Sequence, residues 1–207
     1  PGSTGYALSQ SGTAQHVAGS GSSARISTRD IDPNLAAGEI WFSALMQTGA
    51  TSSTALNFNN NTFSYSDQSL VFTGTNVAWN SGGSGTDGSA SGVVTVGTTF
   101  LVLGQMNLVS GTANQDSLTL WINPDLTGGS LDTADAAFSI TGTEINSTVT
   151  TDSRNTTLAR IGVGMSSSAG LIDMVYLSDN GGSTAIQDVT GVSAITVIPE
   201  PSTILLL

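Results

Sequence analysis

The sequence lacks cysteine and lysine, and it contains a single histidine, His16. Without cysteine no disulfide framework can form, and one histidine leaves little from which to build a zinc or copper site. Four arginines, Arg25, Arg29, Arg154 and Arg160, stand against twelve Asp and three Glu. Because phosphate binding needs clustered cations, the net charge of −11 argues against nucleic acid and anionic lipid as partners.

Charged residues of both signs are scarce, at 9% of the 207 residues, whereas glycine reaches 25 residues. Hydrophobic residues still make up 38% of the chain, which is enough to form a core and argues against disorder. The length suits one domain of ordinary size. We expect a single β-sandwich domain over residues 1–198 and a short separate segment over residues 199–207.

Four segments alternate apolar and polar residues at the period of a β-strand. With the residues expected to share one face, they are 38–48 (Ile40, Phe42, Ala44, Met46), 99–109 (Phe100, Val102, Met106, Leu108), 116–124 (Leu118, Leu120, Ile122) and 171–179 (Ile172, Met174, Tyr176). Shorter candidate strands are 24–31, 54–59, 68–73, 91–96, 136–140, 157–164 and 192–198. No segment shows a convincing helical stripe. The pattern predicts an all-β, two-sheet antiparallel sandwich with jelly-roll topology.

Three stretches carry a family resemblance: IWFSALM (40–46), DSLTLWINPDL (116–126), and ARIGVG (159–164) followed by GLIDMVYLSDN (170–180). They resemble the laminin-G-like, concanavalin A-like jelly-roll domains of exported bacterial proteins. The resemblance covers about residues 20–198 and implies the same fold. In that family a further strand precedes the IWFS segment, so we expect one more N-terminal strand than this sequence supplies.

The segment VIPEPSTILLL (197–207) is similar to the start of a PEP-CTERM sorting signal, with Pro199, Glu200 and Pro201 as the sorting motif. This resemblance implies export, handling by a sorting machinery, and a location outside the cell or on the outer surface of a bacterium. In the family a membrane-spanning helix and a basic tail follow the motif. Here four apolar residues follow (204–207), compared with the ~20 that a spanning helix needs.

The acidic residues do not form a catalytic pattern in the sequence. Glycoside hydrolysis needs two carboxylates on either side of the scissile bond. The glutamates stand alone: Glu39, Glu144 and Glu200. Asp30 and Asp32 occur where a strand is expected to end in a turn, and His16 has no nucleophile-elbow motif near it. We therefore expect a protein that is not an enzyme.

Calcium is the one cofactor that the composition favours, because Ca²⁺ binds six to eight hard oxygen ligands. The candidate donors are Asp67, Asp116, Asp125 and Asp173, but no spacing marks a site. The stretch GGSGTD (82–87) matches the start of a calcium-binding repeat that acts in stacked copies. Only one copy is present, so we interpret it as a flexible loop.

Two further interpretations concern single residues. Trp41, Trp79 and Trp121 are expected mostly in the core, and Trp79, beside the Gly/Ser-rich stretch 80–92, is the candidate for glycan contact. Asp173 lies in an otherwise apolar strand, where a buried unpaired carboxylate would be costly. We predict that Arg160, in the preceding strand, forms a structural ion pair with it.

Two functional hypotheses follow. The first is a non-catalytic exported structural protein of the bacterial cell surface or biofilm matrix, which associates with itself into filaments through strand addition by terminal segments. The alternative is a lectin-like module that binds matrix polysaccharide. Both place the protein outside the cell, and they differ in the partner, which is a further copy of the chain or a glycan.

Overall fold

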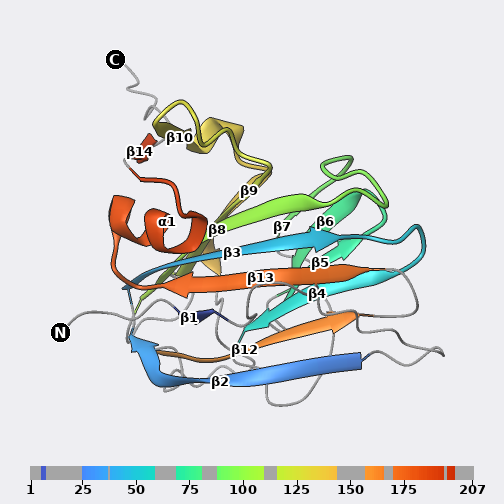
Figure 1. The fold of residues 1–207 in the computed structure, drawn as a ribbon, viewed down its shortest axis with the longest axis horizontal. Coiled ribbons are helices and arrows are strands. Elements are labelled where there is room, and N and C mark those ends of the chain that lie inside the picture. The colour runs from blue at the N-terminus through green and yellow to red at the C-terminus, as the bar shows by residue number, and fades with distance from the viewer. Residues whose placement is uncertain are drawn as a thin grey trace.

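The computed structural model describes residues 6–7, 25–36, 38–58, 69–80, 88–109, 116–143, 157–165, 170–193 and 195–198. Two six-stranded sheets, sheet A and sheet B, form a sandwich (Figure 1). Sheet A has the order β1 (Tyr6–Ala7), β13 (Leu171–Ser178), β3 (Gly38–Gln47), β8 (Phe100–Leu108), β9 (Asp116–Ile122), β11 (Phe138–Thr143). Sheet B has the order β2 (Arg25–Ala36), β12 (Thr157–Met165), β4 (Ser53–Phe58), β5 (Ser69–Thr73), β6 (Asn76–Asn80), β7 (Gly88–Ala90).

Four smaller elements complete the described chain. β10 (Ser130–Asp132) and β14 (Thr196–Ile198) form a parallel pair, η1 (Thr133–Asp135) is a single 3-10 turn, and α1 (Gly182–Thr190) is a helix. All neighbouring strands within sheets A and B are antiparallel, and the chain crosses repeatedly from one sheet to the other. The predicted fold class, an all-β, two-sheet antiparallel sandwich, is confirmed.

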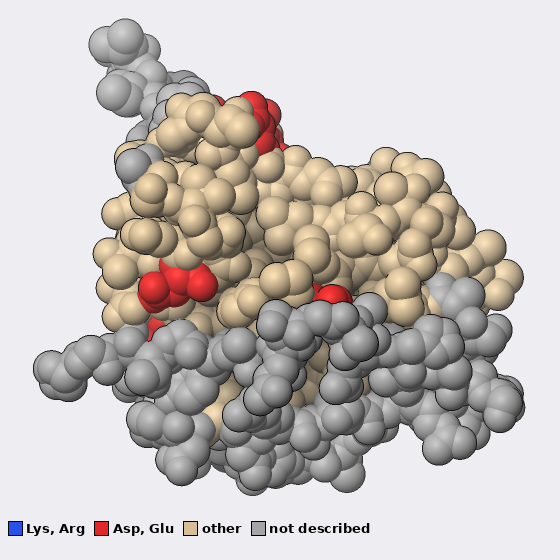
Figure 2. All heavy atoms as spheres, in the orientation of Figure 1, with Lys and Arg blue, Asp and Glu red and all other residues tan. Residues whose placement is uncertain are grey.

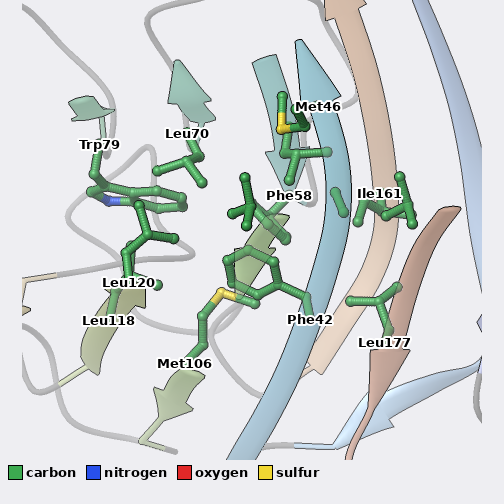
Figure 3. Close-up of a cluster of buried hydrophobic side chains, with 14 of the residues drawn as sticks. Phe42, Met46, Phe58, Leu70, Trp79, Met106, Leu118, Leu120, Ile161 and Leu177 are labelled. Atoms are coloured by element: carbon green, nitrogen blue, oxygen red, sulfur yellow. The ribbon is translucent and has the colours of Figure 1, made fainter. Parts of the chain in front are cut away.

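The main core, which is the set of buried apolar side chains between the two sheets, follows from strand alternation. In β3, Ile40, Phe42, Ala44 and Met46 point inward and are fully buried, as the sequence predicts. The predicted inward faces of β8 and β9 are confirmed in the same way. Figure 3 shows side chains from both sheets meeting in this core: Phe42, Met46, Phe58, Leu70, Trp79, Met106, Leu118, Leu120, Ile161 and Leu177.

A second apolar cluster, the outer cluster, lies on the opposite face of sheet A, beneath α1, β10 and β14 (Figure 1). Its buried residues are Trp41, Leu103, Trp121, Leu131, Ala185, Ile186, Val189 and Ile195. Sheet A is therefore apolar on both faces along part of its length. This explains why Trp41 and Leu103 alternate with core residues and yet are buried.

The prediction that no helix is present is wrong. α1 places Ala185, Ile186 and Val189 against sheet A. It ends at Gly191, which has a left-handed φ of 74° and whose N–H donates to the Gln187 carbonyl oxygen, as helix-terminating glycines commonly do. Nine residues with three inward positions are too few for a clear helical period. No helix among the described residues is long and apolar enough to span a membrane.

The expected alternation in 171–179 is also wrong at one point. β13 contains a β-bulge between Asp173 and Tyr176, at Met174, whose φ is 52°. The extra residue turns Val175 and Leu177 into the main core and Tyr176 toward the outer cluster. Met174 and Tyr176 therefore do not share the face of Ile172.

Two strand assignments differ from those expected in the middle of the chain. Residues 91–96 are bends and turns, and the nearby strand is β7 instead. β6 was not predicted; it forms a hairpin with β5 in which Thr73 pairs with Asn76. Gly74, with a φ of 58°, lies in the two-residue turn. Val77 and Trp79 of β6 alternate into the main core.

Candidate functional site

The candidate glycan contact, Trp79, is not exposed, so that prediction is wrong. Its side chain is 0% exposed and packs in the main core, with its ring 5.8 Å from that of Phe58. A ring in this position offers no face to a sugar. Its Nε1 atom is buried and has no hydrogen-bond partner among the described residues, which carries an energetic penalty.

The other two tryptophans meet on the outer face of sheet A. The rings of Trp41 and Trp121 lie 5.7 Å apart at an interplanar angle of 14°, which is a stacked arrangement. Both are 0% exposed beneath the outer cluster. The indole of Trp121 donates to the backbone oxygen of Asp132, at 2.8 Å. These tryptophans therefore hold β10 and α1 on the sheet and form no open platform.

Glu39 fastens the N-terminal end of α1 to β3. Its Oε1 atom accepts from the backbone N–H of Gly182 at 2.6 Å and from the indole of Trp41 at 2.7 Å. The residue before the helix, Gly181, has no side chain to cap it. The carboxylate of Glu39 takes over this role from a strand distant in sequence, and its charge is favourable next to the positive end of the helix dipole.

The other polar anchors of α1 are hydroxyl groups, an amide and a carboxylate. Ser43 of β3 donates to the backbone oxygen of Val189. At the end of β13, Ser178 donates to Asp188 Oδ2 at 2.7 Å, and the Asn180 side chain donates to the same oxygen. Glu39, Ser43 and Asp188 thus connect the helix to two neighbouring strands of sheet A. The hydrogen bonds of these three side chains hold α1 on sheet A.

The predicted calcium donors do not converge among the described residues. Asp116 accepts from the Val109 N–H at 2.8 Å, and Asp173 accepts from the Met174 N–H at 2.8 Å. Asp125 accepts from Thr127, in a turn. Across the described ranges, no group of three or more His, Cys, Asp or Glu side chains could hold a metal ion. Asp67 lies outside the described residues.

Asp125 lies in a turn whose hydrogen bonds perturb its titration. The pKa of its carboxyl group is lowered from the usual value of 3.8 because the Thr127 hydroxyl and then the Thr127 backbone N–H donate to it. The donor distances are 2.6 Å and 2.8 Å. This arrangement closes the turn after β9, which carries Leu126 onto the outer cluster.

The predicted ion pair between Arg160 and Asp173 stays a prediction, because the side chain of Arg160 lies outside the described part. The backbone places the two residues in different sheets. Arg160 on β12 pairs with Asp30 on β2 in sheet B, and Asp173 on β13 pairs with Leu45 in sheet A. Asp30 and Asp32 both lie within β2, which continues past the expected strand end to Ala36.

Several other predictions fall outside the described residues: His16, Glu144, the 82–87 loop, and the sorting motif Pro199, Glu200 and Pro201. The four arginine side chains also fall outside them. Every described charged side chain is therefore acidic, and Figure 2 shows the acidic residues of one face as separate patches. The described surface offers no cationic group to a polyanionic ligand.

One uncharged surface on sheet A is not covered by α1, β10 or β14. We call it the polar face, and it consists of outward side chains of β8, β9 and β11: Gln105, Asn107, Ser117, Thr119, Ser139 and Thr141. Asn107, Ser139 and Thr141 are exposed. Ser139 donates to the Thr119 hydroxyl at 3.2 Å. The sequence could have predicted this face, because its members are the polar residues that alternate with inward-facing apolar residues such as Met106 and Leu118 along each strand.

No protein-family model matches the chain, and no curated protein matches it in sequence. Solved structures with a similar arrangement include an endo-β-1,4-glucuronan lyase from the fungus Trichoderma reesei, which is 12% identical with a TM-score of 0.48 and covers 90% of this chain and 89% of its own. An alginate lyase is 11% identical with a TM-score of 0.45, covering 75% and 74%. A receptor-binding domain is 11% identical with a TM-score of 0.36, covering 77% and 43%.

Proposed function

We propose that this chain is a non-catalytic, exported structural protein of the bacterial cell surface or extracellular matrix that associates with itself. The observation that supports this most is the use of the acidic side chains. Of the eight that are described, six accept hydrogen bonds that cap α1 or η1, close turns or tie strands: Glu39, Asp116, Asp125, Asp132, Asp173 and Asp188. Catalysis by carboxylates needs at least one such group directed at a substrate.

Export and surface location rest on the sequence alone, through the resemblance of Pro199, Glu200 and Pro201 to a sorting motif. The composition of the chain is compatible with a location in a polysaccharide matrix, since charged residues are few and hydroxyl and amide side chains are many. The net charge of −11 keeps copies apart unless specific contacts hold them together. Self-association must therefore come from hydrogen bonds and apolar contact, as in strand addition.

The proposal is tested by electron microscopy and turnover assays on the full chain. We expect ordered assemblies, and no release of reducing ends or unsaturated products from a panel of neutral and acidic polysaccharides. Deleting residues 199–207, which leaves β14 intact, asks whether the segment at the end of the sequence is the donor strand. Monomers at every concentration, or turnover that survives repurification, would overturn the proposal.

The polar face favours a second candidate function, which is binding of neutral polysaccharide. Amides and hydroxyls that project from adjacent strands match the alternating donors and acceptors of a sugar chain. The acidic surface disfavours polyuronates, so the expected ligand is an uncharged glycan. Asn107→Ala should weaken retention in affinity electrophoresis through a neutral glucan, whereas Gln187→Ala on the exposed side of α1 should not. Equal mobility of wild type with and without glucan would rule this function out.

A further inference from the structure

Exposed sheet edges are templates for pairing with another chain, and proteins usually protect them with short strands, charges, proline or bulges. In sheet B, one edge is β2, whose sequence RISTRDIDPNLA contains four charged residues and a proline. The other edge is β7, which has three residues, Gly88–Ala90. Both edges of sheet B therefore carry a protective feature.

In sheet A, the edge on the side of β1 is protected as well. β1 has two residues and pairs only with Tyr176 and Leu177 of β13. The part of β13 beyond it contains Asp173 and the bulge at Met174, a charge and a distortion that both oppose regular pairing. The small β10–β14 pair has three residues in each strand.

β11 is the edge strand that differs, because its one protective feature, a bulge near Thr143, lies at its end. Its sequence, FSITGT, has no charge and no proline, and Phe138 to Thr141 pair regularly with β9 before a bulge near Thr143. Ser139 and Thr141 are exposed. Phe138 and Ile140 are only partly buried, although they pack against the main core. The described part of the chain places no strand beyond β11 in sheet A.

We propose that β11 of one copy pairs antiparallel with β11 of a second copy, joining their A sheets into one continuous sheet. This inference rests on the self-association proposed above and assigns its surface. A second copy fits this edge because the strand is complementary to itself. With Ile140 opposite its counterpart, Ser139 lies opposite Thr141 on one face. On the other face the two Ile140 side chains meet and Phe138 lies opposite Gly142. The Ser–Thr and Ile–Ile pairs are favourable cross-strand contacts.

The charge distribution gives this contact a distinctive salt dependence. Two copies that each carry −11 repel, whereas β11 itself contributes no charge to the interface. Salt screens the repulsion and leaves the hydrogen bonds and apolar contacts in place. We expect association to strengthen as ionic strength rises, which is the opposite of the behaviour of a salt-bridged interface.

The experiment compares wild type, Thr141→Lys and Thr99→Lys by sedimentation equilibrium, with circular dichroism as a check of folding. Each substitution removes one unit of net negative charge, which by itself favours association. Thr99 is exposed just before β8 and away from β11, and serves as the matched control. In the proposed register the two new lysines would be diagonal neighbours on the same face of the joined sheet, within reach of each other, so we expect association about tenfold weaker or more for Thr141→Lys only.

A second measurement does not depend on that variant. The chain has no cysteine, so Ser139→Cys provides a single attachment point for a spin label. At ~3.4 Å per residue, an antiparallel register that pairs three or more residues of the two six-residue strands places the two labelled positions within about 20 Å. Intermolecular distances in that range support the proposal. Association that Thr141→Lys leaves unchanged, or label distances well beyond that range, overturns the β11 contact alone. A wild type that is monomeric at every concentration and salt level overturns the self-association as well.

Discussion

The main core and the outer cluster are stabilised in different ways, although both pack against sheet A. The main core follows from strand alternation in two sheets and contains large aromatic residues in contact, such as Phe42 and Phe58, whose rings lie 5.1 Å apart. The outer cluster depends on a nine-residue helix and short strands held by Glu39, Ser43 and Asp188. We infer that the sandwich sets global stability and that the outer cluster opens locally at lower cost.

The largest effect is expected from Gly104→Ala in the main core. A Cβ atom at Gly104 would lie 2.0 Å from the Phe42 ring, which is fully buried and packed on its other sides. We expect a loss of about 3 kcal/mol in the free energy of unfolding, measured by urea denaturation. Gly128→Ala is the control, because a Cβ atom at Gly128 would have nothing within 4 Å of it and its effect should be small. Equal losses in the two variants would show that close packing of Phe42 on Gly104 is not the cause.

Removing apolar volume from the outer cluster should cost somewhat less. Ile186→Ala deletes a fully buried side chain of α1, and we expect a loss of about 2 kcal/mol, near the lower end for such truncations. The stacked pair Trp41 and Trp121 provides a local signal in near-ultraviolet circular dichroism, best observed in a Trp79→Phe background. That signal should be lost before the far-ultraviolet strand signal during unfolding. Coincident transitions would mean that the outer cluster and the sandwich unfold as one unit.

The same comparison shows what the sequence could predict. The faces of β3, β8 and β9 could be predicted because a period of two is maintained over six or more residues. In β13 the bulge lies at Met174, a residue type that rarely adopts positive φ. The local sequence therefore gives no signal that the following side chains change face. α1 is too short for a periodic signal and is stabilised by Glu39, which lies 143 positions away.

The position of Trp79 could have been predicted. The stretch NVAWN (76–80) alternates polar and apolar residues, and Thr73 to Asn76 contain the Gly74 turn that a two-residue hairpin requires. The Gly/Ser-rich stretch that follows Trp79 suggests an exposed side chain, but the alternation within 76–80 is the better guide and predicts a buried one. The structural roles of Glu39 and Asp188 could not have been predicted, because each depends on contacts between elements distant in the sequence or on the presence of α1.

Glu39→Gln weakens the attachment of α1 without removing apolar volume. The amide keeps one oxygen acceptor but loses the charge that strengthens both hydrogen bonds. We therefore expect the free energy of local opening of α1 to fall by about 1 kcal/mol. Hydrogen exchange should report faster exchange at α1 amides such as Ile186, with β4 amides unchanged. Asp135→Asn, at an exposed carboxylate in η1, should leave α1 unaffected. Faster exchange in β4 would show that the attachment of α1 also supports the main core.

The smallest effect is expected at the turn that leads from β9 toward the outer cluster. Thr127→Val removes the hydroxyl that lowers the Asp125 pKa most, so this pKa should rise toward 3.8, whereas Thr127→Ser should preserve the lowered value. Because the folded-state pKa is below the unfolded one, the wild-type turn gains stability that is present above the unfolded pKa and is lost as pH falls through the folded pKa. Carboxyl-carbon NMR titration measures both pKa values.

Since Asp125 is fully exposed, solvent screening keeps the effect of this turn on stability small. The circular dichroism signal of the Trp41 and Trp121 pair should therefore persist in Thr127→Val at neutral pH. If that signal were lost, the polar turn would be holding the outer cluster in place, and the contrast between a tightly packed sandwich and a locally anchored outer cluster would have to include this loop among the anchors.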